Sequence, residues 1–281
     1  MIRNSLLVLA ALCSVALPAS ADGPEPLTCR RDGTHAVTAA AARAALAEPL
    51  VVGSDPVHEA ALVNGVNQPR YSQILARLSG AETFQLAGQT RRLQTRWALD
   101  TAHPDGINLA RDYLIDRFQR AGCTIQLQDF THSGDVVSTN VIGVRPGTDF
   151  PGEIVVVGAH YDARAATPGE DAPGAEDNAS GVAAVLHLAE LLESFQPKRT
   201  VHFVAFGCEE YGLLGSEHYV QEALANGDTI VAALTMDMIS AWVDEFGLWI
   251  ESEPPFVDLV DVIAANTVQW TPIPHEIHLN S

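Results

Sequence analysis

Residues 154–162 read IVVVGAHYD, an unbroken apolar run that leads into a histidine and an aspartate. Four consecutive β-branched residues without polar alternation predict a strand that is covered on both faces. The same arrangement recurs twice downstream, where the run Thr200–Phe206 leads into GCEE and the run Ile230–Thr235 leads into MDM. Three predicted strands therefore end in side chains that can ligate a metal.

Helical patterns separate the predicted strands. Apolar residues recur every three or four positions between Gly106 and Gly122, and again in a helix that we expect Ser180 to cap. Alternating strands and helices predict an α/β fold, with a mostly parallel mixed sheet sandwiched between helices and a ligand site beyond the carboxyl ends of the strands. The other expected helices are Arg70–Leu78, Leu213–Leu224 and Val257–Ala265, and the other expected strands are Thr124–Gln128, Val136–Val144, Leu248–Glu251 and Ile273–Leu279.

Ionisable side chains gather at the expected edge of this sheet. Each is weak evidence alone, because an aspartate before a helix is usually a cap and two adjacent glutamates usually form a solvated face. Together they indicate a metal site, since ionisable groups at the ends of apolar strands cost desolvation energy that a divalent cation offsets. Imidazole and carboxylate are the ligands of hydrolytic zinc. The candidates are His160, Asp162, Asp177, Glu209, Glu210 and Asp237.

Four motifs carry a resemblance to a known family: AHYD at 159–162, EDNASG at 176–181, CEEYGLLGS at 208–216 and MDM at 236–238. In this order the sequence resembles the secreted co-catalytic zinc exopeptidases, which include bacterial leucyl aminopeptidases and glutamate carboxypeptidase relatives. The resemblance implies the phosphorylase/hydrolase-like fold of that family. It also implies Zn²⁺ as the cofactor, with two ions in the complete site.

The resemblance implies a role for each metal ligand. Asp177 would bridge the two zinc ions, His160 and Asp237 would complete one site, and Glu210 would bind the other ion. One shared carboxylate would hold the cations close enough to act on one water and one substrate carbonyl. The family also implies a cis peptide between Asp177 and Asn178.

Glu209 would be the general base and would not touch metal, according to the same resemblance. We expect Glu209 and Glu210 to lie on an extended segment, where neighbouring side chains point in opposite directions. Glu210 would then reach the metal while Glu209 faces the substrate. Asp162 would fix the tautomer of the His160 imidazole.

The family has a fifth protein ligand, a downstream histidine that usually lies in a Ser-Asp-His sequence. After Asp237 this sequence offers His275 and His278, and neither lies in that context. We expect that the domain is truncated at its C-terminus and that the sequence stops before this ligand. His278 is the weaker alternative, as a substitute ligand.

Composition narrows the range of partners. The chain has 281 residues with 35 Asp and Glu against 16 Lys and Arg, a formal charge of −19. Such a surface repels phosphate backbones and anionic lipids, so we expect neither nucleic acid nor membrane as a partner. Lys198 is the single lysine, which argues against Schiff-base chemistry. A peptide substrate is the expected partner, and the oligomeric state stays open.

The N-terminus predicts export. Arg3, the apolar stretch Leu6–Leu17 and the small residues at 19–21 are typical of a signal peptide that is cleaved after residue 21. We therefore expect a secreted or periplasmic protein, with an N-terminal extension or propeptide over 22–66 and the zinc exopeptidase domain over 67–281.

Three cysteines, Cys29, Cys123 and Cys208, remain after the signal segment. An oxidising compartment permits a disulfide between Cys29 and Cys123, and three unpaired thiols are the alternative.

The sequence therefore predicts a zinc exopeptidase, with an aminopeptidase favoured over a carboxypeptidase. Two alternatives stay open: a glutaminyl cyclase-like acyltransferase that uses one zinc ion, and an inactive, metal-free binding domain.

Overall fold

The computed structural model describes residues 56–98, 106–132, 136–167, 171–240, 248–252, 257–271 and 274–279. The expected signal segment and residues 22–55 of the expected N-terminal extension lie outside the described residues. The chain divides into two compact units, which we describe separately. One spans Val66–Trp242, and the other combines helix α3 (Pro56–Gly65) with the segment Val243–Ser281.

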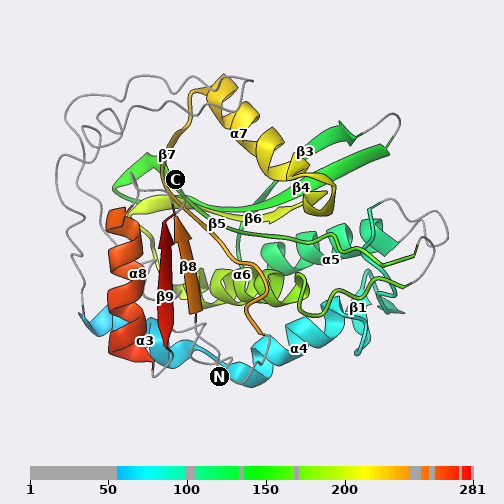
Figure 1. The fold of residues 1–281 in the computed structure, drawn as a ribbon, viewed down its shortest axis with the longest axis horizontal. Coiled ribbons are helices and arrows are strands. Elements are labelled where there is room, and N and C mark those ends of the chain that lie inside the picture. Colours follow the sequence, from blue (N-terminus) through cyan, green and yellow to red (C-terminus); the bar gives the residue numbers. More distant parts are fainter. Residues whose placement is uncertain are drawn as a thin grey trace. The chain divides into compact units, whose positions relative to one another are not determined.

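A five-stranded sheet forms the centre of the unit Val66–Trp242, in the strand order β3-β4-β6-β5-β7 (Figure 1). Strands β5, β6 and β7 run parallel to one another, whereas β4 runs antiparallel to β3 and β6. β4 therefore opposes the four other strands, which confirms the expected α/β fold with a mostly parallel mixed sheet. The strands are β3 (Thr124–His132), β4 (Val136–Arg145), β5 (Phe150–His160), β6 (Arg199–Phe206) and β7 (Thr229–Thr235).

The register of the parallel strands brings their carboxyl ends to one edge of the sheet. His160, the last residue of β5, pairs with Phe206, the last residue of β6. Gly158 of β5 pairs with Thr235, the last residue of β7. The segments that leave β5, β6 and β7 therefore start at the same level, which is where sheets of this kind bind ligands.

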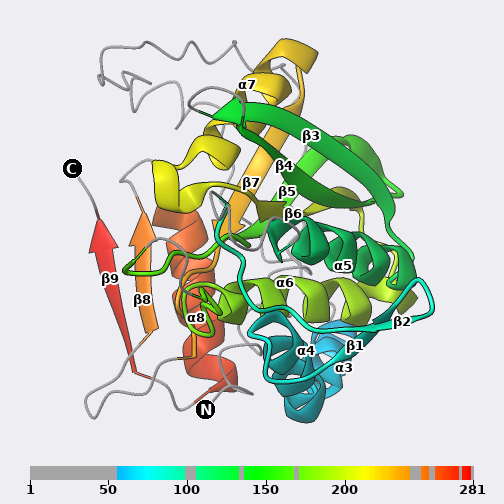
Figure 2. The same cartoon turned by 90° about the vertical axis from the view of Figure 1, so that its right-hand side faces the viewer.

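Helices cover both faces of this sheet. Helices α5 (Gly106–Arg120) and α6 (Ala179–Leu191) pack on one face, and α7 (Leu214–Asn226) packs on the other face against β3 and β4 (Figures 1 and 2). Helix α4 (Gln68–Leu78) packs against α6, so that α6 is buried on all sides from Ala179 to Ala189. The smaller elements of this unit are β1 (Phe84–Leu86), β2 (Gln89–Arg91) and the 3₁₀ turns η1 (Leu192–Ser194) and η2 (Glu209–Tyr211).

The N-terminal cap of α6 differs from the expectation. Asn178, not Ser180, is the capping residue, because its Oδ1 accepts the N–H of Gly181 at 2.9 Å. That N–H belongs to the third helical residue, the usual partner of an N-cap side chain. Ser180 lies inside the first turn, where its hydroxyl donates to the carbonyl of Glu176 at 2.7 Å.

Gly215, in the first turn of α7, packs against the backbone that follows β6. Asn140 of β4 joins the two segments, since its Oδ1 accepts the N–H of Gly207 at 3.1 Å and its Nδ2 donates to the Gly215 carbonyl at 2.7 Å. A Cβ atom at position 215 would lie 2.2 Å from the carbonyl oxygen of Gly207. The close approach of two backbone segments therefore requires glycine at this position.

Replacing Gly215 by alanine should destabilise the fold by about 1–3 kcal/mol, the usual cost of overpacking. Urea unfolding of the metal-free protein measures the change as a lower midpoint at unchanged slope. Gly152→Ala is the control, because an added Cβ at position 152 meets no atom within 4 Å. Equal midpoints for the two variants would contradict the close packing at Gly215.

The other unit contains a helix and a small sheet. Strands β8 (Leu248–Ser252) and β9 (His275–Leu279) pair in parallel, and helix α8 (Val257–Trp270) packs against both. Buried residues of this unit include Ile250 and Val260. Among the described residues of the chain, no helix combines the length and apolar character needed to cross a bilayer.

Both cysteines in the described residues are buried, free thiols. Cys123 lies beside Arg145, with the guanidinium Nη2 3.9 Å from Sγ, and Cys208 follows β6. The described residues do not test a bridge between Cys29 and Cys123, which stays a prediction. Cys29 lies outside the described residues.

Candidate active site

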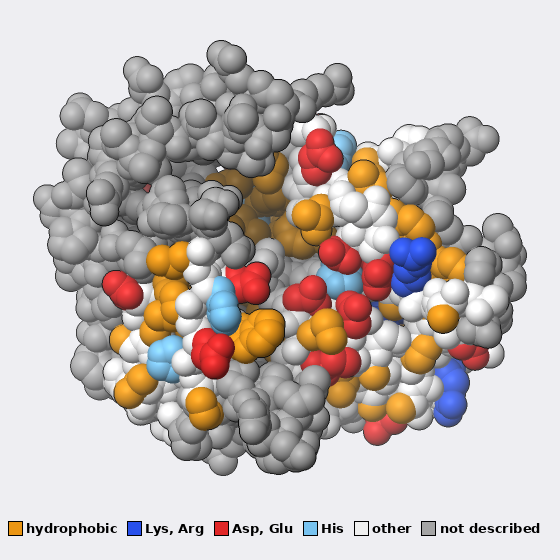
Figure 3. All heavy atoms as spheres, in the orientation of Figure 1, with side chains coloured by type: hydrophobic (Ala, Val, Ile, Leu, Met, Phe, Trp, Pro, Cys, Tyr) orange, Lys and Arg blue, Asp and Glu red, His pale blue; other side chains and the backbone are white. Residues whose placement is uncertain are grey.

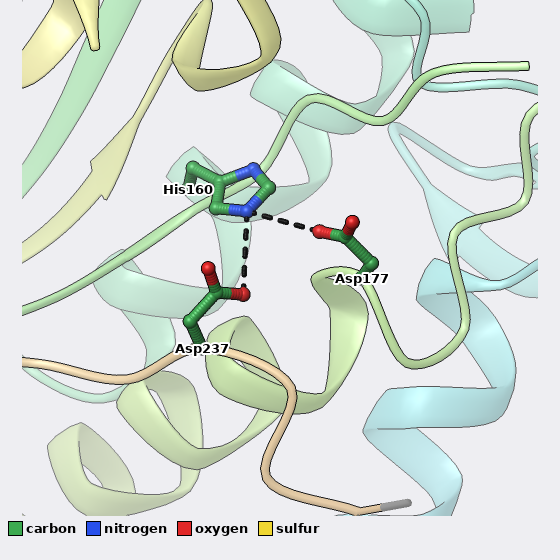
Figure 4. Close-up of side chains that lie close together, drawn as sticks. All are labelled: His160, Asp177 and Asp237. Atoms are coloured by element: carbon green, nitrogen blue, oxygen red, sulfur yellow. Dashed lines mark ion pairs between the residues drawn. The ribbon is translucent and has the colours of Figure 1, made fainter. Parts of the chain in front are cut away.

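His160 ends strand β5 and is almost completely buried. Its Nδ1 lies 3.2 Å from the backbone carbonyl of Asp162, and Nε2 points toward Asp177 and Asp237 (Figure 4). The Nε2 atom lies 3.1 Å from Oδ1 of Asp177 and 3.5 Å from Oδ1 of Asp237. A carbonyl oxygen can only accept a hydrogen bond, so the proton of the neutral imidazole belongs on Nδ1, and Nε2 keeps its lone pair.

The three side chains form a ligand group that suits a metal ion. One ligand atom each of His160, Asp177 and Asp237 lies within 4.8 Å of the other two. The buried Nε2 atom has no hydrogen-bond partner, which is costly unless another ligand is bound. The side chains of Asp177 and Asp237 are 47% and 57% exposed, so the group is open to solvent on the carboxylate side. A neutral imidazole with carboxylates is a donor set that zinc accepts.

The carboxylates change the protonation of His160 in the metal-free protein. Burial by itself lowers the pKa of His160, but the nearby carboxylates of Asp162 and Asp237 outweigh it and raise the pKa to about 10. The imidazole is therefore cationic at neutral pH when no metal is present. Zinc has to displace that proton in order to bind Nε2.

Zinc affinity of the metal-free protein should therefore rise with pH. Below the raised pKa of His160 each bound zinc releases one proton, so the affinity should increase about tenfold per pH unit between about pH 6 and pH 8. Competition with a chromogenic chelator, corrected for the chelator's own protonation, measures this slope. A zinc affinity that is independent of pH over this range would contradict the displacement of a proton from His160 by zinc.

Glu209 and Glu210 lie on the 3₁₀ turn η2, not on the extended segment that we expected. Cys208, immediately before the turn, has a φ of 55°, so its backbone lies in the left-handed region and ends the extended conformation of β6. Successive side chains on a 3₁₀ turn diverge by about a third of a turn. The two glutamates therefore separate for a different geometric reason than the one expected from the sequence.

Asp162 fixes this turn to strand β5. Its fully buried carboxylate accepts the N–H of Glu209 at 3.0 Å and the N–H of Glu210 at 3.2 Å. The same carboxylate lies 3.5 Å from Nδ1 of His160, while the carbonyl of Asp162 lies closer to Nδ1. Asp162 therefore contacts the imidazole and also positions the backbone of both glutamates.

The two glutamates lie in different surroundings. Glu209 is one-third exposed, and its Oε2 lies 3.8 Å from Nε2 of His160. Burial and the neighbouring carboxylates raise the pKa of Glu209 above its usual range, against the charge of His160. Glu210 lies outside the three-residue ligand group. Its pKa is also raised, first by burial and next by the charge of Asp177.

The surface around this group is acidic. Figure 3 shows red carboxylate side chains gathered around a histidine on the face that it presents.

The peptide between Asp177 and Asn178 is cis, which confirms the expectation drawn from the family resemblance. His275 and His278 belong to β9, in the separately described unit, so a role for His278 as a ligand stays a prediction.

Comparisons with known proteins agree with this donor set. The profile described as Peptidase family M28 matches residues 140–265, a segment that contains the three-residue ligand group and both glutamates. A "Probable zinc metalloprotease" of Phaeosphaeria nodorum is 34% identical over 163 residues, which cover 48% of this chain and 33% of that protein. "Aminopeptidase YwaD" of Bacillus subtilis is 41% identical over 103 residues, covering 36% of this chain and 21% of that protein. Residues 140–265 of this chain are therefore similar to Peptidase family M28.

The likeness in fold to a solved structure extends beyond the matched segment. The crystal structure of LapB from Legionella pneumophila superposes with a TM-score of 0.60 at 20% identity, over 80% of this chain and 58% of that chain. The chain spans about a third of the length of the curated relatives that match it first.

Arg96 is a component of this candidate site that sequence reasoning missed. The side chain is fully buried and donates to four backbone carbonyls: those of Leu78 at 2.7 Å, Tyr161 at 2.8 Å and Gly174 at 2.9 Å, and that of Pro173. Burial lowers the pKa of Arg96 to about 10, against the opposing charges of Asp162 and Asp177. A buried cation therefore lies close to the carboxylates and fixes the segments on either side of them. No periodicity or motif marks it in the sequence.

Replacing Arg96 by methionine should cost about 3–5 kcal/mol of stability, because it leaves buried carbonyls unpaired and removes the positive charge near the carboxylates. Arg111→Met is the matched control, since Arg111 is partly exposed and pairs with Asp112 on the surface of α5. Chemical unfolding of the metal-free variants measures both changes. A loss no larger than that of Arg111→Met would contradict the role given to Arg96.

Proposed function

We propose that this protein is an exported, zinc-dependent aminopeptidase that uses two zinc ions and removes single residues from the amino end of peptides. The observation that carries the proposal is the buried, unpartnered Nε2 atom of His160, which faces Asp177 and Asp237 beside Glu209. A buried nitrogen without a hydrogen-bond partner is expected where it ligates a metal. In a metal-free binding domain the same atom would be unfavourable.

The ligand group and its neighbours divide into two half-sites in this proposal. His160, Asp177 and Asp237 would hold one ion, and Asp177 with Glu210 would hold the other. The support for the second half-site is the pKa of Glu210, which burial raises and the charge of Asp177 raises further. When bound, zinc would supply Lewis-acid catalysis by polarising the scissile carbonyl and lowering the pKa of water.

Glu209 would act as the general base. Its carboxylate borders the ligand group without belonging to it, and its raised pKa suits a group that takes up and releases a proton during the reaction. Glu209 would accept a proton from the attacking water and deliver it to the leaving amine. The hydrogen bond from its N–H to Asp162 holds the backbone of Glu209 in place for both transfers.

The choice of an aminopeptidase rests on two lines of support. One relative carries the name aminopeptidase, and another carries the name zinc metalloprotease. The formal charge of −19 favours a substrate end that is cationic, as a free α-amino group is. These names give no support to the acyltransferase alternative.

The variant Glu209→Gln should keep its zinc and lose about 10²–10⁴-fold in kcat, the usual contribution of general acid–base catalysis. Hydrolysis of an aminoacyl chromogenic substrate measures kcat, and elemental analysis after dialysis measures zinc. Glu210→Gln is the contrasting variant and should lose zinc. Loss of zinc in Glu209→Gln, with zinc retained in Glu210→Gln, would show that the roles are reversed.

A further inference from the structure

The two aspartates of the ligand group lie on different segments, and hydrogen bonds join these segments on both sides of the carboxylates. One segment is the turn before α6 together with the first turn of that helix, and the other is the loop after β7. Asn178 Nδ2 donates to the carbonyl of Met236 at 2.8 Å. The N–H of Ile239 donates to Oγ of Ser180 at 3.1 Å.

Glu176 supplies a further link between the same segments. Its Oε1 accepts the N–H of Ser240 at 2.8 Å. The hydroxyl of Ser240 lies 2.6 Å from the hydroxyl of Tyr71, a fully buried residue of α4. The Tyr71 hydroxyl also donates to the carbonyl of Ser180 at 3.1 Å. The loop after β7 is thus attached to the turn before α6 and to the helix that packs on α6.

These links flank both carboxylates in sequence. Glu176 and Asn178 are the two neighbours of Asp177, and their partners Ser240 and Met236 lie on either side of Asp237. The side chains of both aspartates are about half exposed, so packing alone does not hold them. The hydrogen bonds between the two segments therefore determine how far apart the carboxylates lie.

We propose that Glu176 is a positioning residue whose side-chain oxygen holds the Asp237 loop against the Asp177 turn and thereby sets zinc affinity. The proposal rests on the zinc site proposed above. Metal affinity depends on ligands that are already placed before the ion binds, because ordering them on binding costs free energy. Removing the acceptor lets the loop after β7 move, and the carboxylate of Asp237 moves with it.

The acceptor oxygen, not the charge, performs this role. Glutamine at position 176 keeps an oxygen at the place of Oε1, whereas alanine removes it. The two variants lose the same negative charge, so any effect of charge appears in both of them. Rescue by glutamine therefore separates the hydrogen bond from electrostatics.

The experiment compares the zinc dissociation constants of wild type, Glu176→Ala and Glu176→Gln, measured by chelator competition at pH 7.5 on folded, metal-free protein. Glu176→Ala should bind zinc about tenfold more weakly, in keeping with the loss of one well-formed hydrogen bond. Glu176→Gln should bind within about twofold of wild type. Glu222→Ala, an exposed residue of α7, is the control for loss of a glutamate and should match wild type.

A second variant tests the same link from the other segment. Ser180→Ala removes the acceptor of the Ile239 N–H and should also weaken zinc binding, with Ser216→Ala on the surface of α7 as its control. Thermal unfolding without metal accompanies each measurement, because a purely structural loss lowers the melting temperature but leaves the zinc affinity of the folded protein unchanged.

Wild-type affinity in Glu176→Ala would overturn the positioning role, and so would equal weakening in Glu176→Ala and Glu176→Gln. Failure of the wild-type protein itself to bind zinc would overturn the proposed function. The two failures are therefore distinguishable in one set of titrations.

Discussion

The concentration of carboxylates around one buried imidazole is the constraint on which the architecture of this site depends. Asp162 and Asp237 raise the pKa of His160 and lie within ion-pair distance of its ring. The carboxylates of Asp177 and Glu209 also lie within ion-pair distance of it. Like charges at such separations repel one another unless cations compensate them. The buried guanidinium of Arg96 supplies one such charge from inside the protein, and a bound zinc ion would supply more from the solvent side.

Backbone hydrogen bonds, more than side-chain packing, hold the carboxylates in place. The carboxylate of Asp162 binds the first two N–H groups of the turn η2, and Arg96 binds carbonyls next to both His160 and the Asp177 turn. Each ligand-bearing segment leaves a strand end or precedes a helix, where backbone groups have no partner within the regular structure. The site is therefore built from the polar groups that the regular elements leave unpaired.

The sequence is sufficient to predict the sheet and the chemistry of its edge. Continuous β-branched runs such as 154–157 predict covered strands, and the residues that follow them are the ones that the register brings together. The predicted cap of α6 was wrong because Asn178 and Ser180 are both good capping residues. Only the exact position at which the helix begins decides which of the two is the cap. The extended segment predicted for Glu209 and Glu210 was wrong, because Cys208 has a positive φ. Nothing in the sequence marks a non-glycine residue that adopts such a φ. Arg96 was missed because its partners are carbonyls from separate segments, which periodicity does not encode.

Anomalous X-ray scattering at the zinc edge, from crystals of the protein loaded with zinc, tests most directly whether Nε2 of His160 is a metal ligand. We expect an anomalous peak at about 2.0–2.2 Å from Nε2 and from one carboxylate oxygen each of Asp177 and Asp237. Zinc bound elsewhere, with Nε2 of His160 still facing only carboxylate oxygens, would contradict the metal site described for this edge of the sheet.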